Sequence, residues 1–357
     1  MLDRLDAEER FALLKMATGG LRIGVSARLA KTALAFADYR AADLALKGVP
    51  ETERRNFEFQ MAAALLCLPT GHPAQAEEHL LAAMQLAPTN IVAPLKLAAL
   101  RLQASDTNRQ QQARALLLAL RTNSAAKADA LRMLTEDAGR TGQGAAALGY
   151  AGELTKYSEE FRDSLLRLQV VHRFQRDDYS AALVELKARA KANALQAYEL
   201  AQWLRTSGQA DDAEAWLKLV PEIVRQQLPL APLYAGALDK EADWAGLETF
   251  VRGQNWGRRE ALRLLFAARA LRGRGNQLAA SVEWRKAIKA ADKDLPLLRD
   301  LLDIASAWNW ETEVDELLWQ IVNGWPKDQP AFVTLHTRLA KAGNTSGLRT
   351  LYARASQ

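Results

Sequence analysis

The sequence predicts an all-α fold, an α-solenoid of about ten helix-turn-helix units, and two observations predict it. A small or turn-forming residue recurs ten times at intervals of 31 to 37 residues, and the residue five positions later is mostly alanine. No segment alternates apolar and polar residues in the way that a half-buried strand does. A period near 34 residues with two helices per unit is typical of a repeat array, because one helix pair cannot bury both of its apolar faces alone.

The recurring positions divide the chain into units. The turn residues are Ala37, Gly71, Asn108, Gly142, Asp177, Gly208, Ala242, Gly275, Trp308 and Gly343. The residues five positions later are Ala42, Ala76, Ala113, Ala147, Ala182, Ala213, Leu247, Ala280, Glu313 and Leu348. Small side chains at these second positions allow close approach of helix backbones, and we expect them in the packing between helices.

The clearest unit runs from Gly71 to Asn90, where the turn glycine is followed by Ala76, Leu80, Ala83 and finally Pro88. This spacing resembles the second half of a tetratricopeptide repeat, and the resemblance extends from about residue 22 to the C-terminus. It implies a right-handed superhelix in which the first helix of each unit lines a concave groove. The ninth unit departs from the pattern, because it has tryptophan and glutamate where glycine and alanine are usual.

We expect two parts in the chain. Residues 1–20 read as an N-terminal capping helix, with acidic capping residues at its start and Thr18-Gly19-Gly20 at its end. Residues 21–357 read as one continuous repeat array, because no linker or low-complexity tract interrupts them. The stretch from Ser105 to Gln111 is expected to be a lengthened turn inside the third unit.

Patterns of catalytic and metal-binding residues are missing from the sequence, so we expect a non-enzyme with no cofactor and no metal. There is no phosphate-binding Walker sequence and no nucleophile elbow. The single cysteine, Cys67, excludes an internal disulfide and a cysteine zinc site. Gly142-Gln-Gly144 loosely resembles a dinucleotide-binding fingerprint, but it coincides with a repeat turn and follows a predicted helix.

Charge and hydropathy limit the location and the partners. The formal net charge of +5 is mild and permits an acidic partner. No run of eighteen apolar residues predicts membrane insertion. The charged N-terminal sequence lacks an apolar signal core and favours a cytoplasmic protein, or else a soluble fragment of a membrane-anchored or exported one. Usage rich in alanine, leucine and arginine favours a bacterial origin.

Positions three, six, ten and thirteen residues before each turn are expected to face the groove, and the charged residues there are mostly arginine. The planar guanidinium group of arginine is suited to binding carboxylates and phosphates. Eleven basic residues between Arg252 and Lys293 stand against four acidic ones up to Asp294. The favoured interpretation is a solvated basic helix pair balanced by acidic residues elsewhere, and the alternative is a groove that binds an anion. We expect alanine at Arg269 and Arg272 to weaken partner binding and to leave the fold intact. The predicted ligand-binding residues are Arg132, Arg167, Phe174, Tyr198, Gln202, Arg205, Arg269 and Arg272.

All nine tryptophans lie between Trp203 and Trp325. The favoured interpretation is that the C-terminal repeats use bulkier core residues. The alternative is an aromatic binding surface for a sugar or a peptide, with Trp256 and Trp308 as its candidates.

The predicted function is a non-catalytic scaffold that binds a partner protein or an acidic peptide in its groove. The alternative is a regulatory or substrate-presenting segment of a larger membrane-associated machine or enzyme, such as one for polysaccharide synthesis or secretion. Nucleic acid is not an expected partner, because the inward positions do not repeat a pair of base-reading polar residues.

Overall fold

The computed structural model describes residues 25–35 and 37–355, and these residues form helices and turns without a strand. Ten successive helix pairs are present in this part of the chain, which confirms the predicted α-solenoid. The predicted capping helix, residues 1–20, lies outside the described residues. Within the described part, no helix has both the length and the apolar character that crossing a membrane requires.

Contacts between residues divide the described chain into two compact units, and the division falls between Leu183 and Val184, inside α11. The pairs that begin in the first unit are α2 (Val25–Ala35) with α3 (Tyr39–Lys47), α4 (Phe57–Cys67) with α5 (Pro73–Leu86), α6 (Val92–Leu102) with α7 (Thr107–Leu120), α8 (Lys127–Arg140) with α9 (Gly144–Tyr157), and α10 (Phe161–Phe174) with α11 (Arg176–Ala190). A short 3-10 helix, η2 (Glu51–Glu53), precedes α4.

The second unit continues the same alternation. Its pairs are α12 (Ala194–Thr206) with α13 (Ala210–Leu217), α15 (Leu230–Lys240) with α16 (Trp244–Val251), α17 (Glu260–Gly273) with α18 (Gln277–Ala291), α19 (Leu295–Ala307) with α20 (Glu311–Gly324), and α21 (Gln329–Lys341) with α22 (Thr345–Ala355). The sequence analysis did not predict two short elements, α14 (Glu222–Arg225) and the 3-10 helix η3 (Gly257–Arg259).

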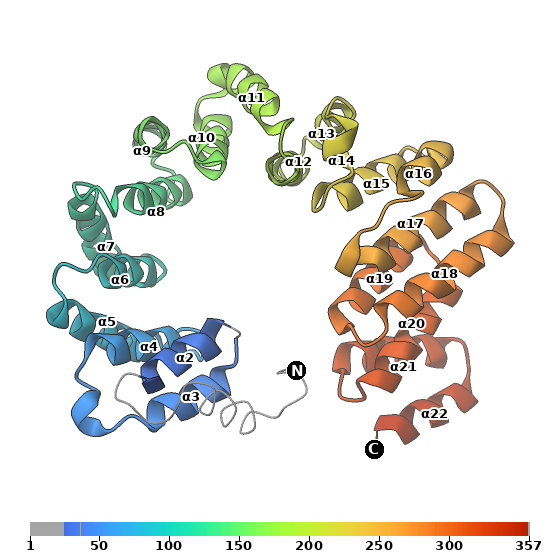
Figure 1. Ribbon diagram of the computed structural model, residues 1–357, viewed down its shortest axis with the longest axis horizontal. Helices are drawn as coiled ribbons and strands as arrows, with labels where there is room; N and C mark the ends of the chain where they lie inside the picture. Colours follow the sequence, from blue (N-terminus) through green and yellow to red (C-terminus); the bar gives the residue numbers. More distant parts are fainter. Residues whose placement is uncertain (1–24, 36, 356–357) are drawn as a thin grey trace. The chain divides into compact units, whose positions relative to one another are not determined.

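Within each unit the first helices of several successive pairs contact one another. In the first unit α2 contacts α4, and α8 contacts both α6 and α10; in the second unit α12, α15, α17 and α19 form a similar chain of contacts. Figure 1 shows α6, α8 and α10 on the inner side of the first unit, with α7, α9 and α11 outside them. First helices therefore supply one side of the stack and second helices supply the other.

Eight of the ten pairs in the described residues are joined by the same hydrogen-bonded turn. At Gly142, whose φ is 77°, the backbone N–H donates to Gly139 O, and the next N–H, of Gln143, donates to Ala138 O. This pair of hydrogen bonds is the Schellman motif, which ends a helix at a residue with positive φ. The eight turn residues are Ala37, Gly71, Gly142, Gly208, Ala242, Gly275, Asn309 and Gly343.

Seven of these turns were predicted at the correct residue, and three predictions were wrong. The ninth turn lies at Asn309 rather than Trp308, because asparagine tolerates the left-handed conformation better than a bulky side chain does. Asn108 lies inside α7 and Asp177 lies inside α11, so neither is a turn residue.

Most of the residues five positions after the predicted turns are buried, as predicted. Seven of the ten are completely buried: Ala42, Ala76, Ala113, Ala147, Ala213, Leu247 and Ala280. In the ninth pair the buried residue is Val314, five positions after the true turn, and the neighbouring Glu313 is only partly buried. Ala182 and Leu348 are also partly buried. The turn and the buried contact shift together, because one helix register sets both.

None of the nine tryptophans, all of which are described, is exposed. Trp216, Trp256, Trp284 and Trp310 are buried, and the other five are partly buried. This supports the core interpretation of the tryptophan-rich half. Trp256 is wrong as a binding candidate, because its ring is buried and its indole N–H donates to Gln254 Oε1 at 2.8 Å.

The turn at Ala242 gives a stability prediction. Its φ of 56° brings Cβ close to the backbone, which costs about 1–2 kcal/mol for a residue other than glycine. Ala242→Gly should therefore raise the free energy of unfolding by about 0.5–1 kcal/mol, after allowance for the larger entropy of glycine in the unfolded chain. Urea unfolding followed by tryptophan fluorescence measures the change.

The matched control is Ala237→Gly inside α15, where φ is helical and glycine should destabilise by about 1 kcal/mol. A decrease in stability for both variants would contradict the strain attributed to Ala242.

Candidate functional site

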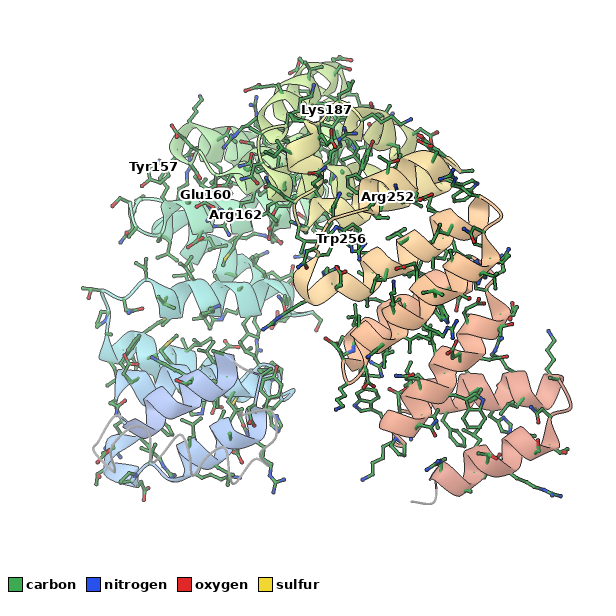
Figure 2. The ribbon with its side chains drawn as sticks, turned by 45° about the vertical axis from the view of Figure 1, so that its right-hand side comes forward. Tyr157, Glu160, Arg162, Lys187, Arg252 and Trp256 are labelled. Carbon is green, nitrogen blue, oxygen red and sulfur yellow. The ribbon has the colours of Figure 1, made fainter. Side chains whose placement is uncertain are left out.

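Arg132 of α8 is held by carboxylates of its own chain. Its Nε donates to Asp163 Oδ1 at 2.5 Å and its Nη2 donates to Asp163 Oδ2 at 2.8 Å, a two-point contact with α10. Its Nη1 donates to Asp129, and Glu160, labelled in Figure 2, lies 3.2 Å from Nη2. The side chain of Asp163 is 1% exposed and that of Arg132 is 13% exposed. Arg132 therefore joins two helix pairs, and its guanidinium is already occupied.

The pKa of Asp163 reflects this pairing. Burial acts to raise the pKa of the carboxyl, but hydrogen bonds from Arg132 and Ser158 and the nearby positive charges outweigh burial, so the pKa is lowered. The hydrogen bond to Asp163 raises the pKa of Arg132 in turn. Both groups are ionised at neutral pH, and the pair is a structural contact.

Arg269 of α17 is enclosed by one carboxylate and three indole rings. Its Nε donates to Asp239 Oδ1 at 2.7 Å, and Trp308 Nε1 donates to the other oxygen of Asp239 at 2.6 Å. The centre of the guanidinium lies 5.1 Å from the ring of Trp244, 4.8 Å from that of Trp308 and 5.9 Å from that of Trp310. These are cation–π distances, so the ring faces offset part of the cost of burying the charge.

Arg272 lies one turn further along the same helix and is also paired. It forms an ion pair with Glu313 of α20, and its guanidinium lies 3.7 Å from the ring centre of Trp310. Its Nε is buried and has no hydrogen-bond partner among the described residues. The arginine–tryptophan cluster consists of Asp239, Trp244, Arg269, Arg272, Trp308, Trp310 and Glu313.

The arginine–tryptophan cluster connects the seventh, eighth and ninth helix pairs. Both arginines therefore belong to the packing between pairs, and the premise that they lie outside it is wrong. Since Asp239 and Glu313 balance the two positive charges, a ligand carboxylate would have to compete with internal partners. Trp308, the second aromatic candidate, is partly buried and is likewise a member of this cluster.

Arg167 and Phe174 lie on α10 in the first unit and differ in accessibility. Arg167 is exposed. Phe174 is partly buried beside the core around Ala147 and Val170, and a Cβ at Gly144 would lie only 2.7 Å from its ring. Phe174 therefore packs on α9, and glycine at position 144 makes room for it.

Three predicted residues share one face of α12 in the second unit. Gln202 Nε2 donates to Tyr198 Oη at 3.2 Å, and both side chains are partly buried. Arg205 is exposed and has no ion pair with any residue that the structure describes. Leu195, which is 53% exposed, lies on the same side of the helix, three residues before Tyr198. We call Leu195, Tyr198, Gln202 and Arg205 the α12 face.

A cavity of about 550 Å³ in the second unit, bounded by α16, α17 and α18, was not predicted from the sequence. The only signal for it was the excess of basic residues after position 252, which was assigned to the groove of the first helices. Groups of three or more histidine, cysteine, aspartate or glutamate side chains placed to hold a metal ion do not occur among the described residues.

No family model matches the chain, and no curated protein does. Among solved structures, a monomeric mutant of IFIT1 with m7Gppp-AAAA has a TM-score of 0.31 at 13% identity, over 98% of this chain and 94% of that one. The human IFIT1 dimer with PPP-AAAA has a TM-score of 0.31 at 14% identity, over 98% and 93%. A circular tandem repeat protein has a TM-score of 0.15 at 14% identity, over 99% and 72%. The likeness concerns the helical repeat fold alone.

One expectation about partners is corrected by these neighbours. Nucleic acid was not an expected partner, yet both IFIT1 structures contain a nucleic acid ligand. That expectation was wrong in its reasoning, because it took a repeated base-reading pair as a requirement for every helical array that binds nucleic acid. We withdraw it.

Proposed function

We propose that this chain is a non-catalytic protein-interaction scaffold of the tetratricopeptide repeat family, and that it binds an acidic peptide segment on the α12 face. The family assignment is supported by the eight identical turns and by the small buried residues that follow them. The observation that carries the binding proposal is Arg205, an exposed guanidinium with no ion pair in the described part of the chain.

The chemistry of the α12 face suits a peptide carboxylate. Arg205 has its planar fork available for a two-point contact with Asp, Glu or a chain terminus. The amide of Gln202 and the hydroxyl of Tyr198 offer further hydrogen bonds beside it, and Leu195 offers an apolar contact. An exposed ion pair alone contributes about 0–1 kcal/mol, so the peptide must engage several of these groups at once.

Charge reversal at Arg205 tests this proposal. Arg205→Glu should weaken binding of acidic peptides about tenfold, since a hydrogen bond to a charged group contributes about 1.5–3 kcal/mol and the variant adds repulsion. An array of short peptides with aspartate or glutamate around an apolar residue, probed with labelled protein and followed by titration of the retained peptides, gives the measurement.

Arg349→Glu supplies the matched control, because Arg349 is exposed on α22 and the charge change is the same. If acidic peptides bind the Arg205→Glu variant as tightly as they bind the unchanged protein, the α12 face is not the binding site.

A further inference from the structure

The helix α17 has two opposite faces, and each has a different environment. Arg269 lies on one face, where it belongs to the arginine–tryptophan cluster. Leu264, Ala267 and Leu271 lie on the other face and line the cavity between the second helices α16 and α18. We call this cavity the outer groove, because second helices form its walls and a first helix forms its floor.

The floor of the outer groove has an apolar part, next to the charged pair Glu260 and Arg263 of α17. Leu264 and Ala267 of α17 form it together with Val251 from the end of α16, and Leu271 continues it. The cavity volume of about 550 Å³ lies in the range of sites that bind small molecules or several peptide side chains. An apolar side chain could therefore leave water on entering the groove, which is the main favourable term in such binding.

The rim of the outer groove carries charge of both signs, and in the pairs of Glu248 with Arg252 and of Glu283 with Lys286 the cation is the more exposed partner. Glu248 is 15% exposed and pairs with Arg252 and Arg274, whereas the side chain of Arg252 is 74% exposed. Glu283 pairs with Lys286 at 2.7 Å on the opposite wall, and Lys286 is again the more exposed partner. Figure 2 shows Arg252 at the end of α16. Arg252 and Lys286 therefore supply positive charge at the mouth, with Glu248 and Glu283 less exposed beside them.

Glu248 and Glu260, which both line the outer groove, remain ionised. Hydrogen bonds from Arg274 and Arg252 lower the pKa of Glu248. Burial acts to raise the pKa of Glu260, but hydrogen bonds from Arg263 and the backbone N–H of Trp256 outweigh it, and this pKa is lowered as well. Glu248 and Glu283 thus fix the positions of Arg252 and Lys286 and leave the outer side of these two cations to solvent. In the Glu260–Arg263 pair the glutamate is the more exposed partner.

An apolar row on α18 leads into the outer groove. Leu278 is 84% exposed and Val282 is also exposed, and both lie in the i, i+4 row that continues to Lys286. The row extends about 12 Å along the helix. A small molecule in the cavity would leave it uncovered, whereas a peptide segment could cover both the row and the cavity.

We propose that the outer groove binds an acidic amphipathic peptide segment of a partner protein. An apolar side chain enters the cavity between α16 and α18, further apolar residues cover Leu278 and Val282, and carboxylates pair with Arg252 and Lys286. This surface is distinct from the α12 face and does not depend on the function proposed for it. Charge complementarity selects the partner, because a basic segment would meet the projecting cations.

Binding of designed peptides tests the outer groove. The probe is a fluorescein-labelled peptide with leucines spaced at i, i+4 and glutamates between them, and its counterpart has lysine in place of every glutamate. Fluorescence polarisation should show binding of the glutamate peptide and at least about tenfold weaker binding of the lysine peptide. Arg252→Glu with Lys286→Glu should weaken binding of the glutamate peptide by about tenfold or more, while Lys327→Glu, an exposed charge outside the groove, should leave it within about twofold.

A second variant keeps the test independent of charge and of folding. Leu278→Ser changes a side chain that is almost fully exposed, so the thermal midpoint should not move, yet peptide binding should weaken about fivefold. Equal binding of the glutamate and lysine peptides would overturn the proposal, as would equal binding by the double variant. Loss of binding in Arg205→Glu with retention in the double variant would assign the peptide to the α12 face and also overturn it.

Discussion

Replacing Asp163 by alanine should lower the free energy of unfolding by about 3–5 kcal/mol, the largest effect that we expect from a single substitution. The carboxylate is 1% exposed and accepts both hydrogen bonds from Arg132, so its removal leaves a largely buried guanidinium without its main partner. Far-UV circular dichroism during urea unfolding measures the change. Tryptophan fluorescence does not, because all nine tryptophans lie in residues 184–357.

Asp129→Ala is the matched control, since it removes a carboxylate that contacts the same guanidinium from an exposed position. We expect a loss of no more than about 1 kcal/mol for this variant. If Asp163→Ala also loses no more than about 1 kcal/mol, the buried pair contributes little to stability, and Arg132 is available to bind a ligand.

The same ion pair predicts a dependence of stability on pH. Because the pKa of Asp163 is lowered in the folded protein, its contribution is fully present above the unfolded value of about 3.9. The contribution is lost as the pH falls through the folded value. The gap in stability between the unchanged protein and Asp163→Asn should therefore shrink on acidification below about pH 4. A gap that stays constant down to the acid transition would contradict the assignment.

Much of the fold follows from local chemistry in the sequence. Glycine at a helix end permits positive φ, and five of the eight Schellman turns have glycine. Ala37 and Ala242 were also predicted at the correct residue, and Asn309 lies one residue from a predicted position. The failures are also local. The sequence places Asn108 and Asp177 at turns, but each lies in the first turn of a second helix, because the period alone cannot fix a register where glycine is missing.

The candidate site could be predicted only in part, because counting positions along one helix ignores the neighbouring pair. Arg132 and Arg269 were placed correctly on first helices, but their partners, Asp163 and Asp239, lie 31 and 30 residues away. These separations are close to one repeat period. Spacing alone does not separate these paired arginines from Arg205, because Asp239 also lies 34 residues after Arg205 and yet pairs with Arg269.

The outer groove could not be predicted from the sequence for another reason. Its floor comes from α17, and its walls come from α16 and α18, so it requires the packing of three helices. The basic excess near Arg252 was visible in the sequence, but the side of the solenoid to which those cations project was not. The structure divides them between α17, where Arg269 is internally paired, and the rim of the groove.

Alanine at both Arg269 and Arg272 should lower the stability of the second unit by about 2–4 kcal/mol, because the variant leaves Asp239 and Glu313 without their cations and removes the cation–π contacts. Tryptophan fluorescence during urea unfolding is the suitable measurement, since Trp244, Trp308 and Trp310 surround the two side chains.

Two further variants separate a structural role of these arginines from a ligand-binding one. Arg258→Ala with Arg285→Ala also removes two positive charges, but from exposed positions, and should change the free energy of unfolding by less than about 1 kcal/mol. Arg269→Lys keeps the charge but loses the planar guanidinium that stacks on the rings, so it should give an intermediate loss if packing matters. The double alanine variant could instead have an unchanged unfolding curve and bind acidic peptides more weakly. That result would show that Arg269 and Arg272 bind a ligand, because arginines needed for packing could not be removed without loss of stability.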